Sequence, residues 1–260
     1  MRDLDQIIKA YDVRGTYPDQ LDADLARAVG IAFVKVAGIA KRDGGPGSVV
    51  IGHDMRPSGP ELVGAFADGV MSQGVDVIEI GLASTDALYF ASGSLGLPGA
   101  MFTASHNPAQ YNGIKFSRAG AQGISLDTGL ASIRDRAIAY LESGLPDADL
   151  VGAYEERDVL AGYAGYLRQL VDLSDIRPIR VVVDAGNGMG GMTVPAVLGT
   201  AAGLPQLPIE LIPLYFELDG TFPNHEANPL EPANLVDLQR AVIAHGADLG
   251  LAFDEDADRC

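Results

Sequence analysis

The sequence predicts an α/β fold: two tandem three-layer α/β domains with mixed, mostly parallel sheets. Short apolar segments typical of buried strands alternate along the chain with longer segments of helical periodicity. This alternation runs twice, on either side of a polar stretch with glycine and proline near residue 147. The chain has 260 residues, of which 47% are hydrophobic, and this is enough for two domains that each bury a core.

The first half alternates strands and helices and then continues into an extended pair of segments. We expect strands at 48–52, 75–80 and 97–102, helices at 21–40, 59–73, 84–92 and 126–141, and an extended pair at 114–117 and 121–124. The apolar run from residue 7 ends in a turn that presents Asp12 and Arg14, and a glycine-rich loop occupies 41–47. Ligands of such sheets bind beyond the carboxyl ends of the strands. Arg56 and Ser105 each follow a predicted strand, so we expect them to line one crevice.

The second half begins after a boundary marked by Gly144, Leu145 and Pro146, which divides the chain into domains at 1–147 and 148–260. A long helix at 153–171 is expected to lead into the second domain. The elements predicted there are strands at 180–183, 209–216 and 248–253 and helices at 192–202 and 235–245. The segment 219–231 is rich in turn formers and predicts an irregular loop.

Acidic residues outnumber basic ones by 35 to 18, and the formal net charge is −17. Such a charge repels the nucleic-acid backbone and anionic membranes, so neither is an expected partner. The longest apolar stretch, 28–40, contains Lys35 and is shorter than the roughly 20 residues that cross a bilayer. The N-terminus has no signal-peptide core and Cys260 is the sole cysteine, which predicts a cytoplasmic protein without an intrachain disulfide.

The segment 103–108, TASHNP, follows an apolar run and predicts an exposed turn that presents Ser105. Pro108 prevents helix continuation, and Lys115 lies on the next extended segment. A serine in this place is suited to carry or receive a chemical group. Serine, asparagine and proline are also ordinary turn residues, so the assignment depends on a partner elsewhere in the chain.

Asp254, Asp256 and Asp258 occupy alternate positions directly after the last predicted strand. This spacing can direct three carboxylates to one point, and hard oxygen ligands suit Mg²⁺. The other interpretation is a solvated acidic turn, but a buried strand, three aspartates and Arg259 in this order favour a metal site. A phosphate oxygen can complete the coordination, with Arg259 holding the phosphate. An EF-hand is excluded because its sixth position requires glycine and here is Arg259.

Two other chemistries fit the sequence less well. For a serine hydrolase, His106 is poorly placed to deprotonate Ser105, because adjacent side chains point apart, and no Gly-x-Ser-x-Gly elbow surrounds the serine. The glycine-rich segment 186–191 suggests a dinucleotide site, but no acid follows at the distance that the dinucleotide fingerprint requires. A tight strand-to-helix turn explains these glycines better.

Taken together, the motifs resemble those of the α-D-phosphohexomutase family, the phosphomannomutase and phosphoglucomutase group. The resemblance rests on segments that follow the family's order along the whole chain: 10–15 (AYDVRG), 103–108 (TASHNP), 112–115 (NGIK), 184–188 (DAGNG), 222–225 (FPNH) and 254–259 (DEDADR). It implies the first two of four family domains. It also implies reversible interconversion of a hexose 1-phosphate and a hexose 6-phosphate, with mannose or glucose as the sugar.

The resemblance implies that Ser105 is a phosphoserine. It donates its phosphoryl group to a phosphorylated hexose and recovers one from the hexose bisphosphate. The implied ligands of Mg²⁺ are Asp254, Asp256, Asp258 and Ser105. The implied catalytic residues are Ser105, His106, Lys115 and Arg14, and the last three surround the transferring phosphoryl group together with Arg259. The implied contacts of phosphate or substrate are Arg259, Tyr11 and Asn107. This transfer depends on a metal and on cations more than on covalent chemistry by neighbouring groups.

The chain departs from the family pattern in two respects. Glu255 stands where the family has glycine, which adds a negative charge to the metal loop and removes backbone freedom, so we expect altered metal affinity or geometry. The chain also lacks the half that selects the sugar and clamps its non-reacting phosphate, so we expect little or no mutase turnover from it alone. The alternatives are a phosphoglucosamine mutase and a non-catalytic fragment that binds phosphosugars.

Overall fold

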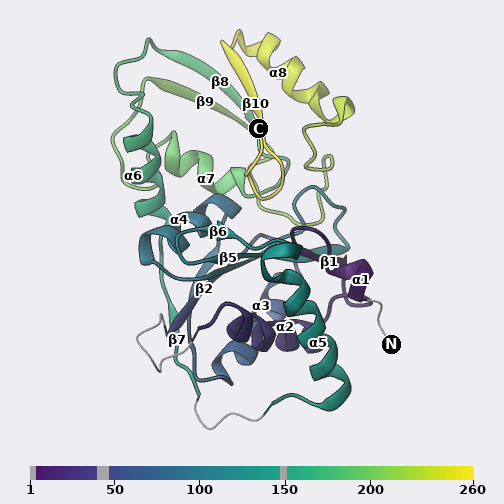
Figure 1. Cartoon of the computed structure of the whole chain (residues 1–260). Helices are drawn as coiled ribbons and strands as arrows, with labels where there is room; N and C mark the ends of the chain where they lie inside the picture. The colour runs from purple at the N-terminus through teal and green to yellow at the C-terminus, as the bar shows by residue number, and fades with distance from the viewer. Residues whose placement is uncertain (1–3, 40–46, 147–150) are drawn as a thin grey trace.

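A computed structural model describes residues 4–39, 47–146 and 151–260, which form two α/β units, one above the other in Figure 1. Each unit has helices on both faces of a sheet, and the predicted fold class is confirmed. The predicted loop at 41–47 falls almost wholly on 40–46, and the predicted boundary after residue 147 falls on 147–150. Both lie outside the described residues, so both stay predictions.

The first unit contains a mixed sheet in the order β1-β5-β4-β2-β3-β7, with β6 paired to β5. Its strands are β1 (Val13–Thr16), β2 (Ser48–His53), β3 (Asp76–Leu82), β4 (Gly99–Phe102), β5 (Tyr111–Arg118), β6 (Gln122–Gly123) and β7 (Tyr154–Glu156). β4, β2, β3 and β7 run parallel, whereas β5 runs antiparallel to both β1 and β4. The carboxyl ends of β2, β3 and β4 therefore share one edge of the sheet.

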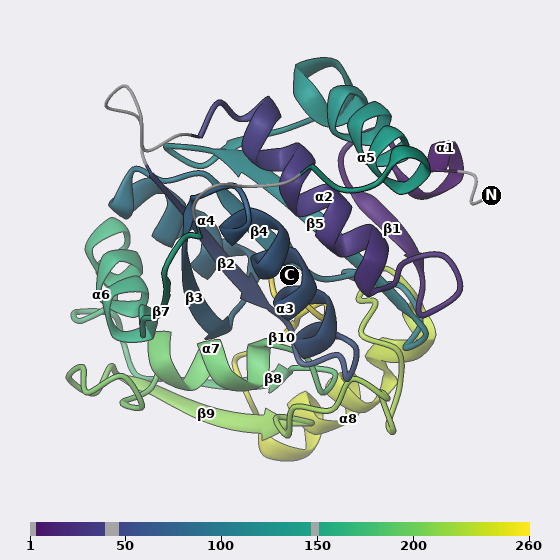
Figure 2. The ribbon, with the colours of Figure 1, turned by 90° about the horizontal axis from the view of Figure 1, so that it is seen from below.

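Helices cover both faces of this sheet (Figure 2). One face carries α2 (Ala23–Val36), α3 (Gly59–Met71) and α5 (Ala131–Ser143), next to the short α1 (Leu4–Ile7); the other carries α4 (Thr85–Leu95) and α6 (Leu160–Leu170). Strand alternation divides the core, because Ile51 and Phe102 pack on the first side and Val50 and Met101 on the second. Within the described ranges, no helix is both long and apolar enough to cross a membrane.

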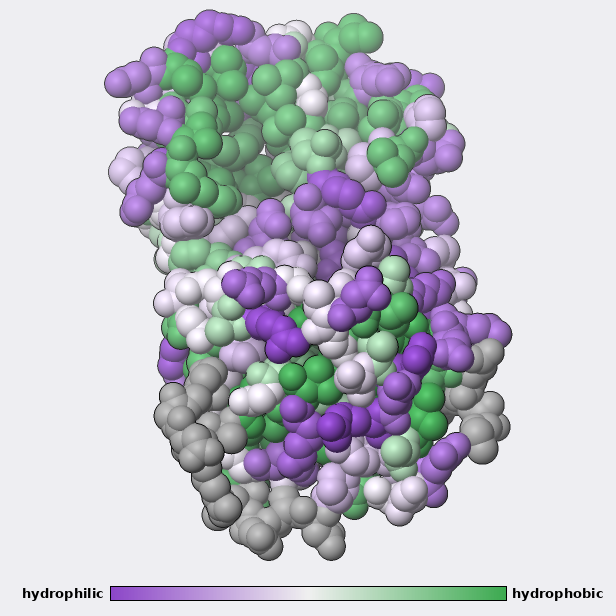
Figure 3. Space-filling model, viewed as in Figure 1, coloured by the Kyte–Doolittle hydropathy of each residue, from purple (hydrophilic) through white to green (hydrophobic). Residues whose placement is uncertain are grey.

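The second unit contains a parallel sheet in the order β10-β8-β9, formed by β8 (Ile179–Asp184), β9 (Ile209–Leu214) and β10 (Leu249–Ala252). α7 (Gly190–Val197) packs on one face through Val194, and α8 (Val236–His245) packs over Gly250 on the other. Figure 3 shows hydrophobic residues gathered over this upper unit. Ile243 and Leu249, of α8 and β10, are exposed, so this smaller core leaves much apolar surface uncovered.

The long helix predicted at 153–171 is wrong in its first part. Residues 154–156 form β7, which pairs with β3 and so belongs to the first sheet. Gly152 lies against the backbone of Val75, where a side chain has no room. The helix α6 begins only after Asp158, whose carboxylate accepts a hydrogen bond from the Leu160 N–H at 2.8 Å and so satisfies a free helix donor.

Three smaller predictions are also corrected. The predicted helix at 192–202 ends at Val197, because the Arg168 side chain donates to the carbonyl of Val197 at 2.7 Å and caps the helix. The helix predicted at 126–141 is interrupted at Gly129, where a π-turn η1 (Leu126–Leu130) leads into α5. Arg14 lies within the strand β1 and not in a turn.

The segment 219–231 is an irregular loop, as predicted, and a short 3₁₀ turn, η2 (Pro232–Leu235), follows it before α8. The loop is held by the turn after β8. His225 Nε2 lies 3.0 Å from Oδ2 of the buried Asp184, and the Asn224 amide donates to Asn187 Oδ1 at 2.8 Å. The two sequence motifs at 184–188 and 222–225 therefore meet and fix this loop.

Replacing His225 with glutamine is expected to remove a pH-dependent part of the stability. The hydrogen bond to Asp184 raises the pKa of His225 above its ordinary value of 6.5. The charged imidazole therefore stabilises the fold fully below about pH 6.5, and this contribution is lost as the pH rises through the folded-state pKa. Urea unfolding should show that H225Q loses about 1–3 kcal/mol at pH 5.5 and less at pH 9. An equal loss at both pH values would contradict this account.

Candidate active site

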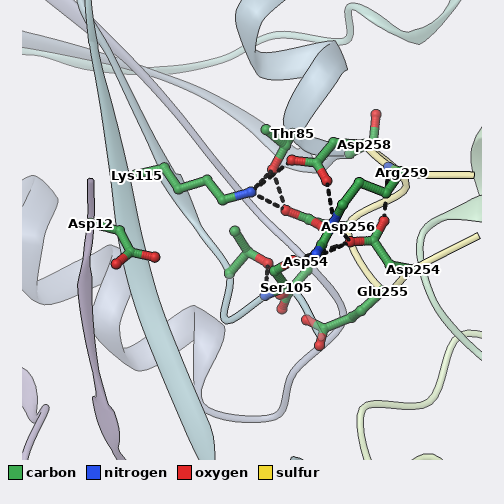
Figure 4. A network of polar contacts seen from close by, with 12 residues as sticks. Asp12, Asp54, Thr85, Ser105, Lys115, Asp254, Glu255, Asp256, Asp258 and Arg259 are labelled. Atoms are coloured by element: carbon green, nitrogen blue, oxygen red, sulfur yellow. Dashed lines mark hydrogen bonds and ion pairs between the residues drawn. The ribbon is translucent and has the colours of Figure 1, made fainter. Parts of the chain in front are cut away.

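Residues that follow the carboxyl ends of four strands from the two units converge on one place, where Figure 4 shows Thr85, Ser105 and the acidic residues close together. From the first unit, β2 leads to Arg56, β3 to Thr85 and β4 to Ser105. From the second unit, β10 leads to the acidic segment 254–259. Parallel strands place their carboxyl ends at one edge of a sheet, and loops there form sites. Arg56 and Ser105 lie next to each other, as predicted, with Arg56 Nη2 3.3 Å from the Ser105 carbonyl, but both are buried, and their lining of a crevice stays a prediction.

Ser105 is held in a constrained position and is 3% exposed. Its φ is 53°, a left-handed conformation that costs a non-glycine residue about 1–3 kcal/mol. The hydroxyl of Thr103 accepts a hydrogen bond from the Ser105 N–H at 2.9 Å. The Ser105 hydroxyl donates to Asp254 Oδ2 at 3.1 Å and accepts a hydrogen bond from the Arg259 guanidinium. The two units thus contact each other through the predicted serine.

The three aspartates form a compact cluster, with one carboxylate oxygen of each lying within 4.8 Å of the others. Asp254 and Asp256 are fully buried. Lys115, from β5, donates to Asp256 Oδ2 at 2.6 Å and to Asp258 Oδ2 at 2.8 Å, and the Thr85 hydroxyl donates to Asp256 at 2.6 Å. Burial alone would raise the pKa of Asp256, but Lys115 and Thr85 outweigh it and hold that pKa below its usual value.

The cluster fits a hard divalent cation. Within the described part of the chain, Asp256 Oδ1 and Asp258 Oδ1 are buried and accept no hydrogen bond. Burial, and then the charges of Asp256 and Asp258, raise the pKa of Asp254 to about 7. Asp258 Oδ1 lies 3.4 Å from Arg259 Nε, so the oxygen of Asp256 is the less compensated of the two. Buried carboxylate oxygens without hydrogen bonds, together with crowded negative charge, are what a divalent ion with oxygen ligands compensates. The cluster can therefore hold a metal, with the Ser105 hydroxyl beside it.

His106 lies beside Ser105 but faces a cation. Its Nδ1 is 3.5 Å from Ser105 Oγ and 2.8 Å from a guanidinium nitrogen of Arg259. Because guanidinium is always a donor, Nδ1 accepts from Arg259 and is not free to take the serine proton. Burial lowers the pKa of His106, and so do Arg259 and Arg14, which keeps the imidazole neutral at pH 7. This geometry does not favour hydrolysis through a serine-histidine pair.

Arg14, Asn107 and Tyr11 are the remaining residues that the sequence assigned to the site. Arg14 donates to the side chain of Asn107 and forms an ion pair with Asp12, which ties β1 to the Ser105 loop. Tyr11 is 78% exposed and lies with Lys115 on the wall of a cavity of about 400 Å³. The roles predicted for these residues in binding phosphate or substrate stay predictions.

Comparison with known families identifies the chain's relatives. The family model "Phosphoglucomutase/phosphomannomutase, alpha/beta/alpha domain I" matches residues 5–140, and the model for domain II of the same family matches residues 161–260. The chain therefore belongs to the phosphoglucomutase/phosphomannomutase family. The predicted resemblance to the phosphohexomutases, limited to the first two domains, is confirmed.

Comparison with individual members of the family also matches nearly the whole chain to about half of each relative. The chain is 43% identical over 254 residues to "Phosphohexose mutases" of Xanthomonas campestris and 38% identical over 255 residues to "Phosphomannomutase" of Escherichia coli. Each match covers 97% of the chain, and 53% and 54% of these relatives. A crystal structure of a family protein from Burkholderia thailandensis superposes with a TM-score of 0.83 at 37% identity, over 98% of this chain and 54% of that one. The chain thus spans about half the length of the curated relatives it matches.

Sequence reasoning missed Thr85 at this family member's site and gave no role to Arg56. Thr85 was placed only at the start of a predicted helix, yet its hydroxyl donates to Asp256 and its N–H to the Asp256 carbonyl at 3.1 Å. Arg56 was placed at the crevice without a role. The signal for both was the same, since each follows the carboxyl end of a parallel strand.

Glu255 was expected to add its charge to the metal cluster, but its side chain lies away from that cluster. Its carboxylate points away from the three aspartates (Figure 4) and pairs with Arg56, whose Nε lies 2.7 Å from Glu255 Oε1. The loop's left-handed residue is Ala257, with φ 55°, and position 255 does not share that conformation. The expected loss of backbone freedom therefore does not strain the loop at Glu255. The effect of Glu255 on metal affinity stays a prediction.

The glycine-rich turn at 186–191 supports the acidic loop. The Met189 N–H donates to the Glu255 carbonyl at 2.7 Å. A Cβ on Gly188 would lie 2.6 Å from the same carbonyl oxygen, so only glycine lets the two segments approach this closely. A tight turn therefore explains these glycines without a dinucleotide site. The turn packs directly against the acidic loop and supports it.

Proposed function

We propose that this chain supplies the phosphoserine and metal half of a phosphohexomutase active site. The complete site would interconvert a hexose 1-phosphate and a hexose 6-phosphate, with mannose or glucose as the sugar, through a bisphosphorylated intermediate. The observation that supports this most strongly is the 3.1 Å hydrogen bond from the Ser105 hydroxyl to Asp254 of the acidic cluster. Family membership and the names of its relatives agree with it.

In this proposal Ser105 accepts and donates the phosphoryl group. Asp254 Oδ2 accepts the hydrogen of its hydroxyl, so the oxygen lone pairs are directed elsewhere and can meet an incoming phosphorus. Arg259 contacts the same hydroxyl oxygen and is placed to hold phosphoryl oxygens. His106, kept neutral, fixes the Arg259 guanidinium. These groups orient the reaction and supply positive charge, which is what phosphoryl transfer requires of a protein.

The aspartates Asp254, Asp256 and Asp258, with an oxygen of Ser105, would hold Mg²⁺. Such an ion, when bound, supplies positive charge that stabilises the phosphoryl oxygens in the transition state. Lys115 neutralises Oδ2 of Asp256 and of Asp258, so that Oδ1 of each, of which the Asp258 atom lies 3.4 Å from Arg259 Nε, would face the ion. The proposed partners are a phosphorylated hexose and a hexose bisphosphate.

Exposure to α-D-glucose 1,6-bisphosphate in the presence of Mg²⁺ is expected to phosphorylate Ser105 of the purified chain. Phosphopeptide mass spectrometry locates the phosphate, and S105A, which removes only the hydroxyl, is the matched control. A phosphate on Ser105 that is absent from S105A and needs Mg²⁺ supports the proposal. An intact chain that gains no phosphate at Ser105 would exclude it.

Because the chain spans about half the length of its relatives, the alternatives are separated by a turnover assay of any longer protein that contains it. Turnover of mannose or glucose 1-phosphate is the expected result. Preferential turnover of glucosamine phosphates would assign the chain to a phosphoglucosamine mutase. Binding of these sugars without any turnover would leave the non-catalytic alternative.

A further inference from the structure

Arg56 is a buried arginine, 1% exposed, in the loop that follows β2. Its Nη1 donates to the carbonyl oxygens of Pro108 at 2.8 Å and Tyr111 at 2.7 Å. Its Nη2 donates to the carbonyl of Asn107 at 2.6 Å and lies 3.3 Å from that of Ser105. One guanidinium therefore holds four carbonyls of the segment 105–111, which contains the phosphoryl-accepting serine.

The same guanidinium also reaches the acidic loop of the second unit. Its Nε donates to Glu255 Oε1 at 2.7 Å, and its Nη2 contacts Glu255 Oε2. Glu255 is fully buried and stands between the predicted metal ligands Asp254 and Asp256. Arg56 and Glu255 thus connect the loop that carries Ser105 with the loop that carries the metal cluster.

The loop 219–231 of the second unit packs against this pair. The ring of Phe222 lies over the guanidinium, 5.4 Å from its carbon, and supplies a cation–π contact. A Cβ on Gly220 would lie 2.7 Å from the Arg56 Cα, so the loop 219–231 passes very close to the backbone there. The pair is enclosed by protein on both sides, and its electrostatic attraction is little screened by water.

Arg56 has no donor left for a substrate. A guanidinium has five N–H groups, and the carbonyls of 105–111 together with Glu255 engage all of its nitrogens. Asp54 adds a second carboxylate, with its Oδ2 3.6 Å from the Arg56 Nε. Arg56 is therefore not a phosphate ligand, unlike the exposed face of Arg259.

We propose that Arg56 and Glu255 are positioning residues that lock the Ser105 loop to the metal loop. The pair keeps Ser105 Oγ against Asp254 without depending on a bound ion, so the serine and the metal cluster are prearranged for transfer. The consequence for transfer rests on the proposed function. The positioning itself does not, because it is a property of the loop 104–111 that can be measured without any substrate.

The test compares R56M/E255M with the wild-type chain by hydrogen exchange of the backbone amides. The double variant removes both charges of the pair, but it leaves the buried carboxylate of Asp54 and the carbonyls of 105–111 without Arg56, so it is expected to be less stable than the wild type. Urea unfolding first establishes that it is folded under the conditions of the exchange experiment. Its amides at 104–111 are expected to exchange about tenfold faster, since the segment loses hydrogen bonds to a charged group. Amides of β2 are expected to keep their wild-type rates.

The second readout is the rate at which α-D-glucose 1,6-bisphosphate with Mg²⁺ phosphorylates Ser105. This rate is expected to fall about 100-fold in R56M/E255M, because small misplacements of reacting groups have effects of that size. E255Q keeps an oxygen for Arg56 and is expected to lie between the double variant and wild type. R168M is the matched control, because Arg168 also donates to backbone carbonyls but at the end of α7; it is expected to change neither readout at 104–111.

The outcomes are distinguishable. A folded R56M/E255M with wild-type exchange at 104–111 overturns the inference, and so does faster exchange with an unchanged phosphorylation rate. If the double variant does not fold, E255Q decides by the same two readouts. If the wild-type chain is not phosphorylated at all, the proposed function fails, while hydrogen exchange still decides whether the pair positions the loop.

Discussion

Replacing Lys115 with methionine is expected to lower the free energy of unfolding of the metal-free chain by about 3–5 kcal/mol. Lys115 is the cation that contacts the fully buried Asp256, and it also contacts Asp258. Burial would lower the pKa of Lys115, but the two aspartates outweigh this and raise it. The ammonium therefore stays charged, and its loss leaves buried carboxylates that repel each other.

Mg²⁺ is expected to restore much of the stability of K115M. A divalent ion replaces the missing positive charge, so saturating Mg²⁺ should raise the stability of K115M more than that of the wild type. Urea unfolding with Mg²⁺ and with a chelator measures both effects. K35M removes an exposed lysine of α2 and serves as the control, with little expected change. A loss in K115M that Mg²⁺ does not reduce would contradict the assignment of the cluster as a metal site.

Phosphorylation of Ser105 should also fall in K115M, but, unlike the stability, its rate should not be restored by Mg²⁺. Mg²⁺ can restore stability, but it cannot supply the second cation next to the transferring group. The phosphorylation rate in saturating Mg²⁺ is therefore expected to stay about 100-fold or more below the wild-type rate. Full recovery of this rate would show that Lys115 acts only on stability.

Replacing Phe66 with alanine is expected to destabilise the chain by about 3–5 kcal/mol. Phe66, from α3, is fully buried and meets Phe102 edge to face at 5.3 Å between ring centroids. Phe33 and Phe116 complete this aromatic cluster at 6.1 Å and 6.2 Å. Phe102 ends β4, three residues before Ser105, so the cavity left by alanine loosens the support of the serine loop as well.

F90A is the matched control for F66A. Phe90 lies on α4 and packs against the rings of Tyr163 and Tyr166 at the partly exposed side of the first unit. Its replacement is expected to cost about 2 kcal/mol, less than F66A, because the half-buried Phe90 ring loses less buried area than the fully buried Phe66 ring. Urea unfolding measures the free energy of unfolding of both variants. Equal losses of this free energy in F66A and F90A would show that the aromatic core next to β4 does not dominate stability.

The elements predicted correctly are those whose signals are local. The helix α2 has apolar residues at helical spacing and Asp22 at its start, where the carboxylate accepts a hydrogen bond from the Leu25 N–H at 3.0 Å. Strands β2 and β8 are short apolar runs that end in polar turns. The strand β7 was missed because three residues at a sheet edge have no periodicity of their own, and their pairing with β3 depends on tertiary contact.

The same distinction applies to the site. Ser105 and the three aspartates were predicted from spacing and from the family resemblance, and the structure places them together. The pair of Arg56 and Glu255 was not predicted, because the two residues are 199 positions apart and neither sequence segment indicates the other. Glu255 was even expected to disturb the metal loop. Only the packing of the two units shows that its charge is compensated by an arginine.

One site, made from both units, is proposed to hold the metal and the serine together. Crystals of the chain soaked in Mn²⁺, which accepts the same oxygen ligands as Mg²⁺, test it by anomalous diffraction. One strong anomalous peak is expected among the carboxylates of Asp254, Asp256 and Asp258, within coordination distance of Ser105 Oγ or its phosphate. A peak elsewhere, or none at this cluster in saturating Mn²⁺, would contradict the account.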